Sequence, residues 1–421
     1  MNNEFINFRN FTYIRINKKI SDYFKEDGYL RIPENIYLNK IIKTIFLRIF
    51  RKIFLILKIF FNSKIFIKEP EKNYNILLDD DLINVTKNLF TRKNYFTLNT
   101  RIENINKIYL SKKIVFFILQ NFFKHSLKIN YLISIIKIVQ PKNIITLTDN
   151  SIDFFILNKF FSRSNIDFYC IQNSHKYFSK NFLIRKNRFI SNYLTFGDFE
   201  KKIYKKAKIK KFIPTGSLKA EVAKIKLSKS KINFNKYDIC LISDPNISAF
   251  EDTKSQSNAD EGVTLVTKHC IKFSKKFNKS IIISGKTDLN DSSKYLEEKY
   301  YEHILDGKKI KIQFNKKSDF GSYKNILQSK VTVTCMSSLA REAFEFKKKV
   351  LWCQYIDGTK FPSYGICVIK KKNYEEFEKI LLKILKLNFK SYEKKIKNIK
   401  LTYNKKFNAI DYMRNKTSNF K

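Results

Sequence analysis

Short apolar runs alternate with longer amphipathic stretches through the middle of this 421-residue chain. Each run ends in polar residues, and a segment with helical spacing follows it. Strands that alternate with helices in this way are typical of a parallel sheet with crossover helices. The pattern predicts a first α/β domain over residues 136–222, with strands within the segments 143–151, 166–175, 192–198 and 210–221.

The alternation restarts after a Lys/Ser-rich segment, 223–236, which lacks a large apolar block and is the predicted domain linker. Residues 237–372 form the predicted second α/β domain, which includes a helix over roughly 259–278 with acidic residues near its start. The predicted fold class is α/β, with two Rossmann-like, doubly wound domains facing a cleft. The predicted strands of the second domain lie at 237–243, 280–286, 309–314, 331–335 and 350–355.

The two ends of the chain carry other patterns. Residues 1–135 show long Ile/Phe/Lys patterns without clear punctuation, so we expect a mostly helical region that is part of the first domain or packs on it. Residues 373–421 are predicted to form C-terminal helices, because 373–400 is lysine-rich and amphipathic.

The charge balance is strongly basic. The chain has 83 Lys and Arg against 38 Asp and Glu, a formal net charge of +45. Such an excess indicates nucleic acid or an anionic membrane surface as a partner, but the Lys, Ile, Asn and Phe bias is spread evenly and also fits drift in an A+T-rich genome. Without a helix–turn–helix, zinc-finger or RNP-like motif, nucleic acid is not the expected partner.

Residues 40–68 form the most apolar segment, with eight basic residues and no acidic one. Because no stretch of about 20 uncharged residues occurs, the segment is not expected to cross a bilayer. It fits a basic, aromatic-rich helix on an anionic leaflet, and it fits equally well an ordinary core helix with solvated lysines.

The six cysteines form no C-x-x-C pair and several stand within apolar runs, which favours buried free thiols in a reducing compartment. The first ten residues contain no hydrophobic signal core. We therefore expect a cytoplasmic protein, with association with the inner face of the cell membrane left open.

In an open α/β sheet, ligands bind beyond the carboxyl ends of the strands. In the second domain Ser243, Gly285 and Lys286 stand at predicted strand ends, and so do Ser337 and Ser338. The two serines would cap a helix near Leu339 and leave backbone N–H groups for a phosphate, with Lys286 adding a positive charge. Glu342 would accept hydrogen bonds from ribose. The alternative interpretation is an ordinary helix cap, with Glu342 answering the helix dipole.

The segment YKNILQSKVTVTCMSSLAREAFEFKKKVL (323–351) resembles the nucleotide-binding segment of bacterial surface-polysaccharide biosynthesis proteins with a glycosyltransferase-B-type architecture. Those proteins typically show a Ser-Tyr followed by a helix, an apolar strand, a Ser-Ser or Ser-Thr turn, a Glu-Ala helix and a basic residue before another apolar strand. The usual glycine before the basic residue is absent here. The matching positions are Ser322-Tyr323, Val331–Cys335, Ser337-Ser338, Glu342-Ala343 and Lys349.

Two first-domain segments, NIITLTDNSIDFF and FYCIQNSHKY, are similar to paired segments of O-antigen biosynthesis proteins, where one strand ends in Asp-Asn and the next in Gln-Asn. A glycine often follows the Gln-Asn in that family, whereas Ser174 stands here. The likeness covers roughly residues 140–370. It implies a glycosyltransferase of surface polysaccharide, O-antigen or capsule, with a nucleotide-sugar donor, a glycan or lipid-linked acceptor, and no separate cofactor.

In such an enzyme the first domain would bind the acceptor and supply any base. Deprotonation of a hydroxyl needs a group with a pKa near the working pH. His175 follows a predicted strand end and would act as base or phosphate partner, with Asp149 as orienter or alternative base; the alternative for His175 is an exposed loop histidine. Residues Asn150, Gln172 and Asn173 would hydrogen-bond sugar hydroxyls.

The stretch LLDDDL (77–82) contains an Asp-x-Asp pattern that could share a divalent cation. Three acidic residues before LINVTKNLF more simply begin a helix, so no metal site is expected.

Three other functions stay open. A sugar-nucleotide epimerase of similar architecture would need a charged acid/base set across the cleft, which the acid-poor strand ends of the first domain do not favour. A non-enzymatic nucleic-acid-binding protein would explain the charge. A non-catalytic member of the family could act as an assembly partner at the membrane.

Overall fold

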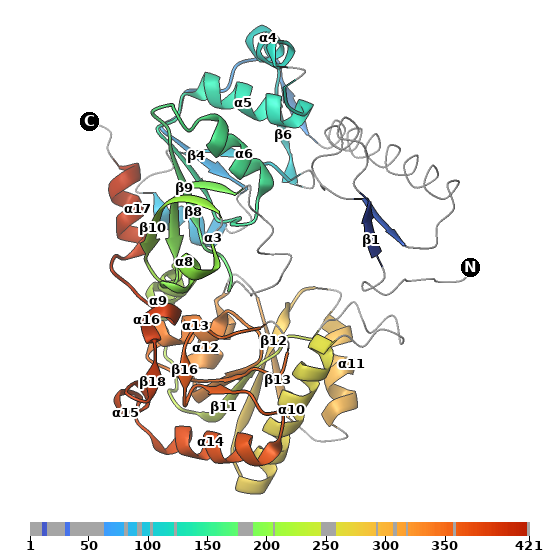
Figure 1. The fold of residues 1–421 in the computed structure, drawn as a ribbon, viewed down its shortest axis with the longest axis vertical. Coiled ribbons are helices and arrows are strands. Elements are labelled where there is room, and N and C mark those ends of the chain that lie inside the picture. The colour runs from blue at the N-terminus through green and yellow to red at the C-terminus, as the bar shows by residue number, and fades with distance from the viewer. Residues whose placement is uncertain are drawn as a thin grey trace. The chain divides into compact units, whose positions relative to one another are not determined.

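The computed structural model describes residues 11–14, 30–33, 63–79, 83–90, 95–101, 104–121, 124–175, 188–204, 207–245, 258–291, 294–305, 310–316, 319–356 and 359–418. The fold is built on two six-stranded sheets (Figure 1). Neighbouring strands in the described pairings of both sheets run parallel, which confirms the predicted α/β class. The chain forms two compact units: unit 1 is Met1–Asp80, Asn94–Thr146 and Asn150–Ile166, and unit 2 is Asp81–Lys93, Leu147–Asp149 and Asp167–Lys421.

The first sheet has the strand order β10-β9-β8-β7-β4-β5. Chain order reverses between β4 and β7, so the sheet is doubly wound. The four strands of this sheet that come last in the sequence, β7 to β10, lie where the apolar runs predict them. The bounds are β4 (Asn75–Leu78), β5 (Tyr95–Leu98), β7 (Asn143–Thr146), β8 (Asp167–Ile171), β9 (Phe189–Thr195) and β10 (Lys208–Pro214).

In the described part of residues 1–135, strands accompany the helices, and the prediction of a mostly helical region did not include them. This region supplies β4 and β5 to the first sheet, and β3 (Lys64–Phe66) pairs in parallel with β6 (Lys107–Tyr109). The physical reason is that periodicity alone cannot distinguish a buried strand from a helix when an apolar run is short. All four residues of β4 are buried, so this run has no polar positions that would show a period of two. Of the predicted amphipathic segment 40–68, residues 40–62 lie outside the described residues. The other elements are β1 (Phe11–Ile14), β2 (Leu30–Pro33), α3 (Ile83–Thr86), η1 (Lys87–Leu89) and α4 (Lys112–Gln120).

Serines begin the longer helices that follow. The side chains of Ser126, Ser151 and Ser217 each accept a hydrogen bond from the backbone N–H three residues later, which satisfies a donor that the first turn leaves open. The predicted linker, 223–236, includes the C-terminal end of the helix that Ser217 begins, α9. The bounds are α5 (Leu127–Val139), α6 (Ile152–Phe160), α8 (Phe199–Ile203) and α9 (Leu218–Leu227).

The second sheet has the order β13-β12-β11-β14-β15-β17. Chain order runs outward from β11 to β13 on one side and from β14 to β17 on the other, so the switch point lies between β11 and β14. The five strands of this sheet that come first in the sequence, β11 to β15, overlap the predicted apolar runs. The bounds are β11 (Tyr237–Ile242), β12 (Ile281–Asp288), β13 (Lys311–Asn315), β14 (Ser329–Thr334), β15 (Lys349–Cys353) and β17 (Val368–Ile369).

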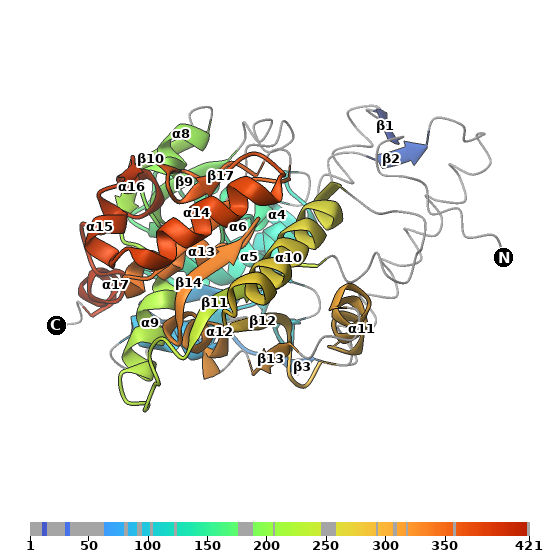
Figure 2. The ribbon, with the colours of Figure 1, turned by 90° about the horizontal axis from the view of Figure 1, so that it is seen from below.

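Helices α10 and α14 pack side by side on this sheet (Figure 2), where the rings of Phe273 and Phe377 are 6.3 Å apart and Lys276 pairs with Glu378 at 2.8 Å. Both helices were predicted from the sequence pattern. Trp352 in β15 is fully buried in the core between strands and helices. The bounds are α10 (Asn258–Phe277), α11 (Lys294–Leu305), α12 (Gly321–Leu327), α13 (Leu339–Ala343), η5 (Phe344–Phe346) and α14 (Tyr374–Lys386).

The C-terminal region contains four helices and the short strand β18 among its described residues. Within unit 2 its last helix returns to η1, because Arg414 Nε donates to the carbonyl of Asn88 at 2.9 Å and Thr417 Oγ1 donates to that of Leu89 at 3.1 Å. The remaining elements are β16 (Tyr364–Gly365), α15 (Phe389–Glu393), β18 (Ile396–Lys397), α16 (Ile399–Thr402) and α17 (Ala409–Thr417).

All six cysteines are buried free thiols, which confirms that part of the cysteine prediction. Over the described ranges, no helix has the length and apolar character that crossing a membrane requires.

Candidate functional site

The carboxyl edge of the second sheet, at the switch point between β11 and β14, is the place where this fold class binds ligands. Ser243 and Asp244 follow β11, and the turn Cys335–Ser338 follows β14. Lys286 lies near the end of β12, the strand on the other side of β11. The structure therefore brings three of the predicted nucleotide-binding segments to neighbouring strand ends within unit 2.

Lys286 and Asp244 form an ion pair at this edge. Lys286 Nζ lies 3.3 Å from Asp244 Oδ1, and the lysine side chain is 50% exposed while the aspartate side chain is 15% exposed. Burial raises the pKa of the Asp244 carboxyl above its ordinary value, and the Lys286 ammonium opposes that shift. The carboxylate holds the lysine beside the end of β11 and leaves its side chain half exposed to solvent.

Of the two serines predicted to cap α13, Ser337 does so, because its hydroxyl accepts the N–H of Leu339, the first residue of the helix, at 3.4 Å. Ser338 does not cap the helix. Ser338 already has helical backbone angles (φ −60°, ψ −23°), and its side chain makes no capping hydrogen bond to α13. A residue with helical φ and ψ does not point its hydroxyl back at the first turn. Both serines are half-buried, and in the described part of the chain neither the hydroxyl nor the N–H of Ser338 donates a hydrogen bond. Ser338 therefore presents two donors that a bound anion could use.

Glu297 on α11 fixes the end of β12. Its carboxylate accepts hydrogen bonds from the N–H groups of Lys286 and Thr287, both at 2.9 Å, and from the Thr287 hydroxyl at 2.6 Å. The predicted binding residue Ser243 is buried and donates its hydroxyl to the same carboxylate. These contacts make Ser243 and Glu297 a support for Lys286.

The other predicted residues of this domain face inward. A Cβ on Gly285 would lie 2.6 Å from the Phe314 ring, so the glycine allows close packing of β12 on β13. Glu342 is 2% exposed and accepts the Ser217 hydroxyl at 2.6 Å, while the buried Tyr323 on α12 is a further hydrogen-bond partner of this carboxylate. Ser322 is half-buried on α12. Glu342 thus supports the turn between β10 and α9, a position that does not favour contact with ribose.

Two of the predicted acceptor-side residues of the first sheet are engaged in the protein interior. The Asp149 carboxylate is buried and accepts from the Asn173 N–H at 3.2 Å and from the Tyr193 hydroxyl at 3.3 Å. Gln172 donates to Glu200 at 2.8 Å and accepts the Phe196 N–H at 2.8 Å. In contrast, the side chain of Asn150 is exposed, and Asn173 is half-buried.

His175 is 4% exposed and is not the exposed loop histidine of the alternative interpretation. Its ring stacks on Phe199 at 5.9 Å and meets the edge of Trp352 at 5.5 Å. Its Nδ1 lies 3.3 Å from Nη1 of Arg341, three residues beyond Ser338. The predicted histidine and the predicted serine turn are therefore connected through one side chain inside unit 2.

Arg341 is the centre of this cluster. It donates to Glu200 Oε1 at 2.6 Å and Oε2 at 3.2 Å, and neither side chain of the pair is exposed. It also donates to the carbonyls of Thr402 at 3.0 Å and Leu401 at 3.2 Å. A guanidinium offers five donors in a planar fork, which matches a bidentate carboxylate together with carbonyl acceptors.

Sequence reasoning missed Arg341, Glu200 and Glu297 as site-forming residues. Arg341 stands inside the motif that predicts the nucleotide site, but its only local signal is that it interrupts a capping box after Ser338. Glu200 is 141 positions away from Arg341, so no local spacing indicates the pair.

Asp79, the first acid of the LLDDDL stretch, fixes a loop in unit 1. It is buried, and its carboxylate accepts from the N–H of Thr100 at 2.6 Å and that of Arg101 at 3.1 Å. In the ranges that the structure describes, no group of three or more His, Cys, Asp or Glu side chains is arranged to hold a metal ion.

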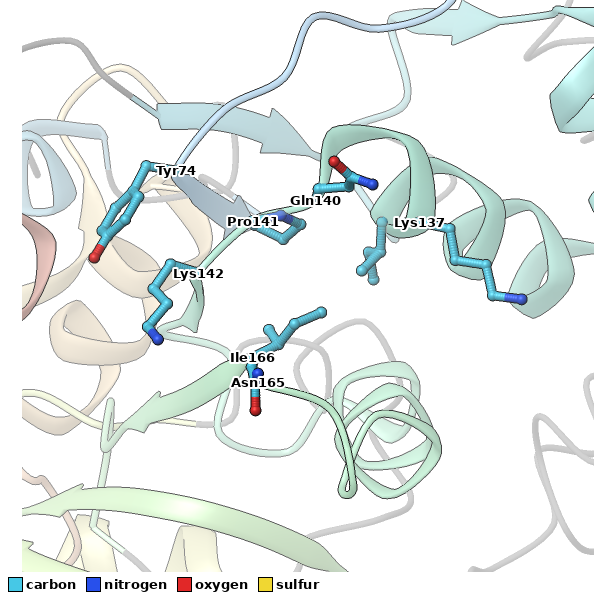
Figure 3. Close-up of a pocket in the computed structure, with 8 residues that line it drawn as sticks. Tyr74, Lys137, Gln140, Pro141, Lys142, Asn165 and Ile166 are labelled. Atoms are coloured by element: carbon cyan, nitrogen blue, oxygen red, sulfur yellow. The ribbon is translucent and has the colours of Figure 1, made fainter. Parts of the chain in front are cut away.

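A surface hollow of about 430 Å³ lies in unit 1, where the residues before β4 and β7 meet the end of α5 (Figure 3). This is the amino edge of those strands, opposite to the edge where such sheets bind ligands, so we do not assign the substrate site to it. The lining residues are Tyr74, Ile136, Lys137, Gln140, Pro141, Lys142, Asn165 and Ile166.

No protein-family model matches the sequence. A search of the curated proteins likewise gives no match.

Solved structures resemble the fold at low sequence identity. UDP-GlcNAc 2-epimerase from Neisseria meningitidis bound to UDP-GlcNAc aligns with a TM-score of 0.50 at 12% identity, over 81% of this chain and 97% of that one. A glycosyltransferase from Rickettsia africae aligns at 0.42 with 14% identity over 79% and 97%, and the wall teichoic acid polymerase TagF at 0.42 with 12% over 91% and 98%. The first alignment and the strand order show that the chain shares the glycosyltransferase-B-like fold.

Proposed function

We propose that this chain is a nucleotide-sugar-using glycosyltransferase of surface-polysaccharide biosynthesis, with its donor nucleotide at the carboxyl edge of the second sheet. The observation that supports this most directly is the placement of Ser338 and Lys286 on the two sides of β11. An anion donor site and a solvent-open cation thus flank the end of β11, beside the switch point of a doubly wound sheet.

A nucleotide diphosphate suits the chemistry of this edge. The Ser338 N–H and hydroxyl can donate to one phosphate oxygen, and the Lys286 ammonium supplies a point charge to the diphosphate. Asp244 keeps that ammonium in place before a ligand arrives, and Glu297 fixes the backbone that carries it. The nucleotide is then bound by pre-positioned groups.

The acceptor-side residues divide by their burial. Exposed Asn150 and half-buried Asn173 keep their proposed role of hydrogen bonding to sugar hydroxyls. Buried Asp149 and His175 act as positioning residues, since Asp149 holds the Asn173 backbone and His175 contacts Arg341. A catalytic role for His175 or Asp149 stays a prediction.

Thermal unfolding with nucleotides tests the proposal. A ligand at about 100 times its Kd adds roughly 2.7 kcal/mol to the free energy of unfolding, so the matching nucleoside diphosphate or its sugar should raise the Tm by several degrees. The Ser338→Trp variant should abolish this shift by filling the site, and Ser338→Ala, which removes only the hydroxyl, should reduce it. The absence of a shift with every purine and pyrimidine diphosphate, together with tight and salt-sensitive DNA binding, would favour a nucleic-acid-binding protein instead.

The fold similarity to the Neisseria enzyme makes sugar-nucleotide epimerisation the second candidate function. The two reactions differ in their need for an acceptor. NMR of the chain incubated with a nucleotide sugar alone would show a new sugar-nucleotide isomer for an epimerase. A transferase should consume the donor faster when a glycan acceptor is added and should give no isomer.

A further inference from the structure

Helix α4 in unit 1 presents apolar side chains to solvent. Phe116 is 62% exposed, Leu119 65% and Val115 46%, and these positions lie on one face because they are three and four residues apart. Scattered single apolar residues are ordinary on protein surfaces, but three large ones on one short helix form a patch.

The helix is held firmly from its other side. Ser111 caps it by accepting the Ile114 N–H, and Ile114 is fully buried. At its C-terminal end Asn121 Nδ2 donates to the carbonyl of Phe117 at 2.9 Å, and the Lys137 ammonium on α5 lies 4.9 Å from the Phe117 ring. Helix α4 is thus apolar on its packed face and on its outer face. In Figure 1 it lies at one end of unit 1 with α5 beside it.

A further exposed apolar side chain follows the end of β3. Ile67 is 89% exposed, and this segment adjoins the start of α4, because Leu110 N–H donates to the Phe66 carbonyl at 2.8 Å and Lys113 pairs with Glu69 at 3.1 Å. We call Ile67, Val115, Phe116 and Leu119 the α4 surface.

The chain segments that carry the α4 surface are basic. Glu69 and Glu71 are the acidic residues beside β3, and Glu69 is paired with Lys113. The exposed lysines of these segments are Lys64, Lys68, Lys107, Lys112, Lys113 and Lys124. Long lysine side chains can lie along an apolar surface while their ammonium groups reach a charged layer.

We propose that the α4 surface docks on an anionic lipid bilayer, with Phe116 and Leu119 among the acyl chains and the lysines at the headgroups. A nine-residue helix is about 14 Å long, too short to span about 30 Å of hydrocarbon, and it suits a position in the plane of the interface. Two copies of this lysine-rich face would repel each other, whereas anionic headgroups complement them.

The inference is independent of the nucleotide site, because it uses none of that site's residues. The sequence analysis considers a membrane contact in segment 40–68, whereas this proposal places a membrane contact on helix α4. Ile67 belongs both to the α4 surface and to the C-terminal end of that segment.

Flotation of the full chain with phosphatidylcholine vesicles, with and without phosphatidylserine, tests the docking. Binding should require phosphatidylserine and weaken at high salt. The Phe116→Ser/Leu119→Ser variant should lower the bound fraction at least about tenfold, because two buried apolar side chains are lost. The control Ile225→Ser removes a half-exposed apolar side chain (50%) from α9 in unit 2 and should float like the wild type. Equal flotation of the double variant and the wild type overturns the proposal, and so does a wild-type chain that stays unbound.

A site-specific probe separates the α4 surface from the rest of the chain. All six native thiols are buried, so a thiol-reactive, polarity-sensitive fluorophore should label Phe116→Cys selectively in the folded protein. Its emission should shift to the blue with phosphatidylserine vesicles and not with phosphatidylcholine alone, and a label at Ile225→Cys should not respond. A chain that floats while the label at 116 stays unchanged would place the contact elsewhere, for example in residues 40–62. A concentration-dependent dimer that the double variant abolishes would assign the surface to a second copy; both results overturn the proposal.

Discussion

Arg341 and Glu200 form a bidentate ion pair whose two side chains are both completely buried. Glu200 belongs to the helix after β9 of the first sheet, and Arg341 belongs to the helix after β14 of the second sheet. The pair also connects to His175 and to the carbonyls of Leu401 and Thr402. Within unit 2 a single guanidinium therefore ties together three segments that are far apart in the sequence.

Removing one partner of this pair should be costly. Glu200→Gln leaves the Arg341 charge buried without its counter-charge, and such changes lower the free energy of unfolding by about 3–5 kcal/mol. Urea unfolding followed by circular dichroism measures the loss. The matched control is Lys201→Gln, which breaks the neighbouring exposed pair with Asp198 and should cost less than about 1 kcal/mol. Similar midpoints for the two variants would show that the buried pair contributes no more than a surface pair.

Three buried glutamates surround Ser217 at the start of α9. Glu345 accepts the Ser217 N–H, Glu342 accepts its hydroxyl, and Glu221 accepts from Lys405 at 2.8 Å. Tyr323 and Tyr403 also face this cluster, and Lys219 lies near Glu342. Burial raises the pKa of Glu345 from 4.5 to about 8, against the Ser217 N–H and the Lys405 ammonium, which favour the charged form.

This shift predicts a pH-dependent effect of Glu345→Gln. A carboxyl whose pKa is higher in the folded state binds its proton more tightly there, so its contribution to stability is present below pH 4.5 and is lost as pH rises toward about 8. The uncharged glutamine avoids that loss. The stability of the variant relative to wild type should therefore rise between pH 5 and 8 by up to about 1.4 kcal/mol per pH unit.

Urea unfolding of both proteins at several pH values checks this relative gain. Glu378→Gln is the control, because Glu378 pairs with Lys276 and its pKa is lowered, so this variant should gain nothing as pH rises. A constant difference between Glu345→Gln and wild type from pH 5 to 8 would contradict the raised pKa.

Lys349 caps the end of α14 from the start of β15. Its Nζ donates to the carbonyls of Ile384 at 2.7 Å, Leu387 at 2.6 Å and Leu385 at 3.2 Å, which are acceptors that the last turn of a helix leaves open. Lys349→Met keeps the apolar stem and removes the donor. We expect a loss of about 1–3 kcal/mol for the buried acceptors left without it. Lys347→Met, at an exposed turn position, is the control for thermal unfolding, and equal Tm values for the two variants would contradict the capping role.

The predicted strands of the second domain were found because buried parallel strands are continuous apolar runs with polar ends. Tyr237–Ile242 (YDICLI) and Lys349–Cys353 (KVLWC) both contain such a run. The run Asn75–Leu78 is as well buried, but it is short and lies among Ile/Phe/Lys patterns that also suit helices. Length and context therefore decided what could be predicted.

The candidate site divides in the same way. The strand-end positions of Lys286 and of the Ser337-Ser338 turn could be predicted, because a strand end is a local feature of the sequence, and their nucleotide-binding role stays a prediction. The inward orientation of Glu342 could not be predicted, because it depends on Ser217, 125 positions earlier. Partners distant in the sequence decide whether a polar side chain at a strand end faces a ligand or the interior.

Two Lys–Asp pairs at opposite ends of the second sheet allow a controlled test of the nucleotide edge. Lys286 pairs with Asp244 at the carboxyl edge, and Lys330 pairs with Asp238 at 2.8 Å at the amino edge; the lysine side chains are 50% and 45% exposed. Lys286→Ala should raise the Kd for a nucleoside diphosphate about tenfold, since a charge-assisted contact to phosphate contributes roughly 1.5–3 kcal/mol, partly offset by release of Asp244. It should also reduce the salt dependence of binding, because one cation fewer faces the ligand. Lys330→Ala removes the same charge from the whole protein and should leave Kd unchanged in calorimetric titration. If both variants bind equally well, the diphosphate does not lie beside Lys286; if both bind equally weakly, net charge and not the switch point attracts the nucleotide.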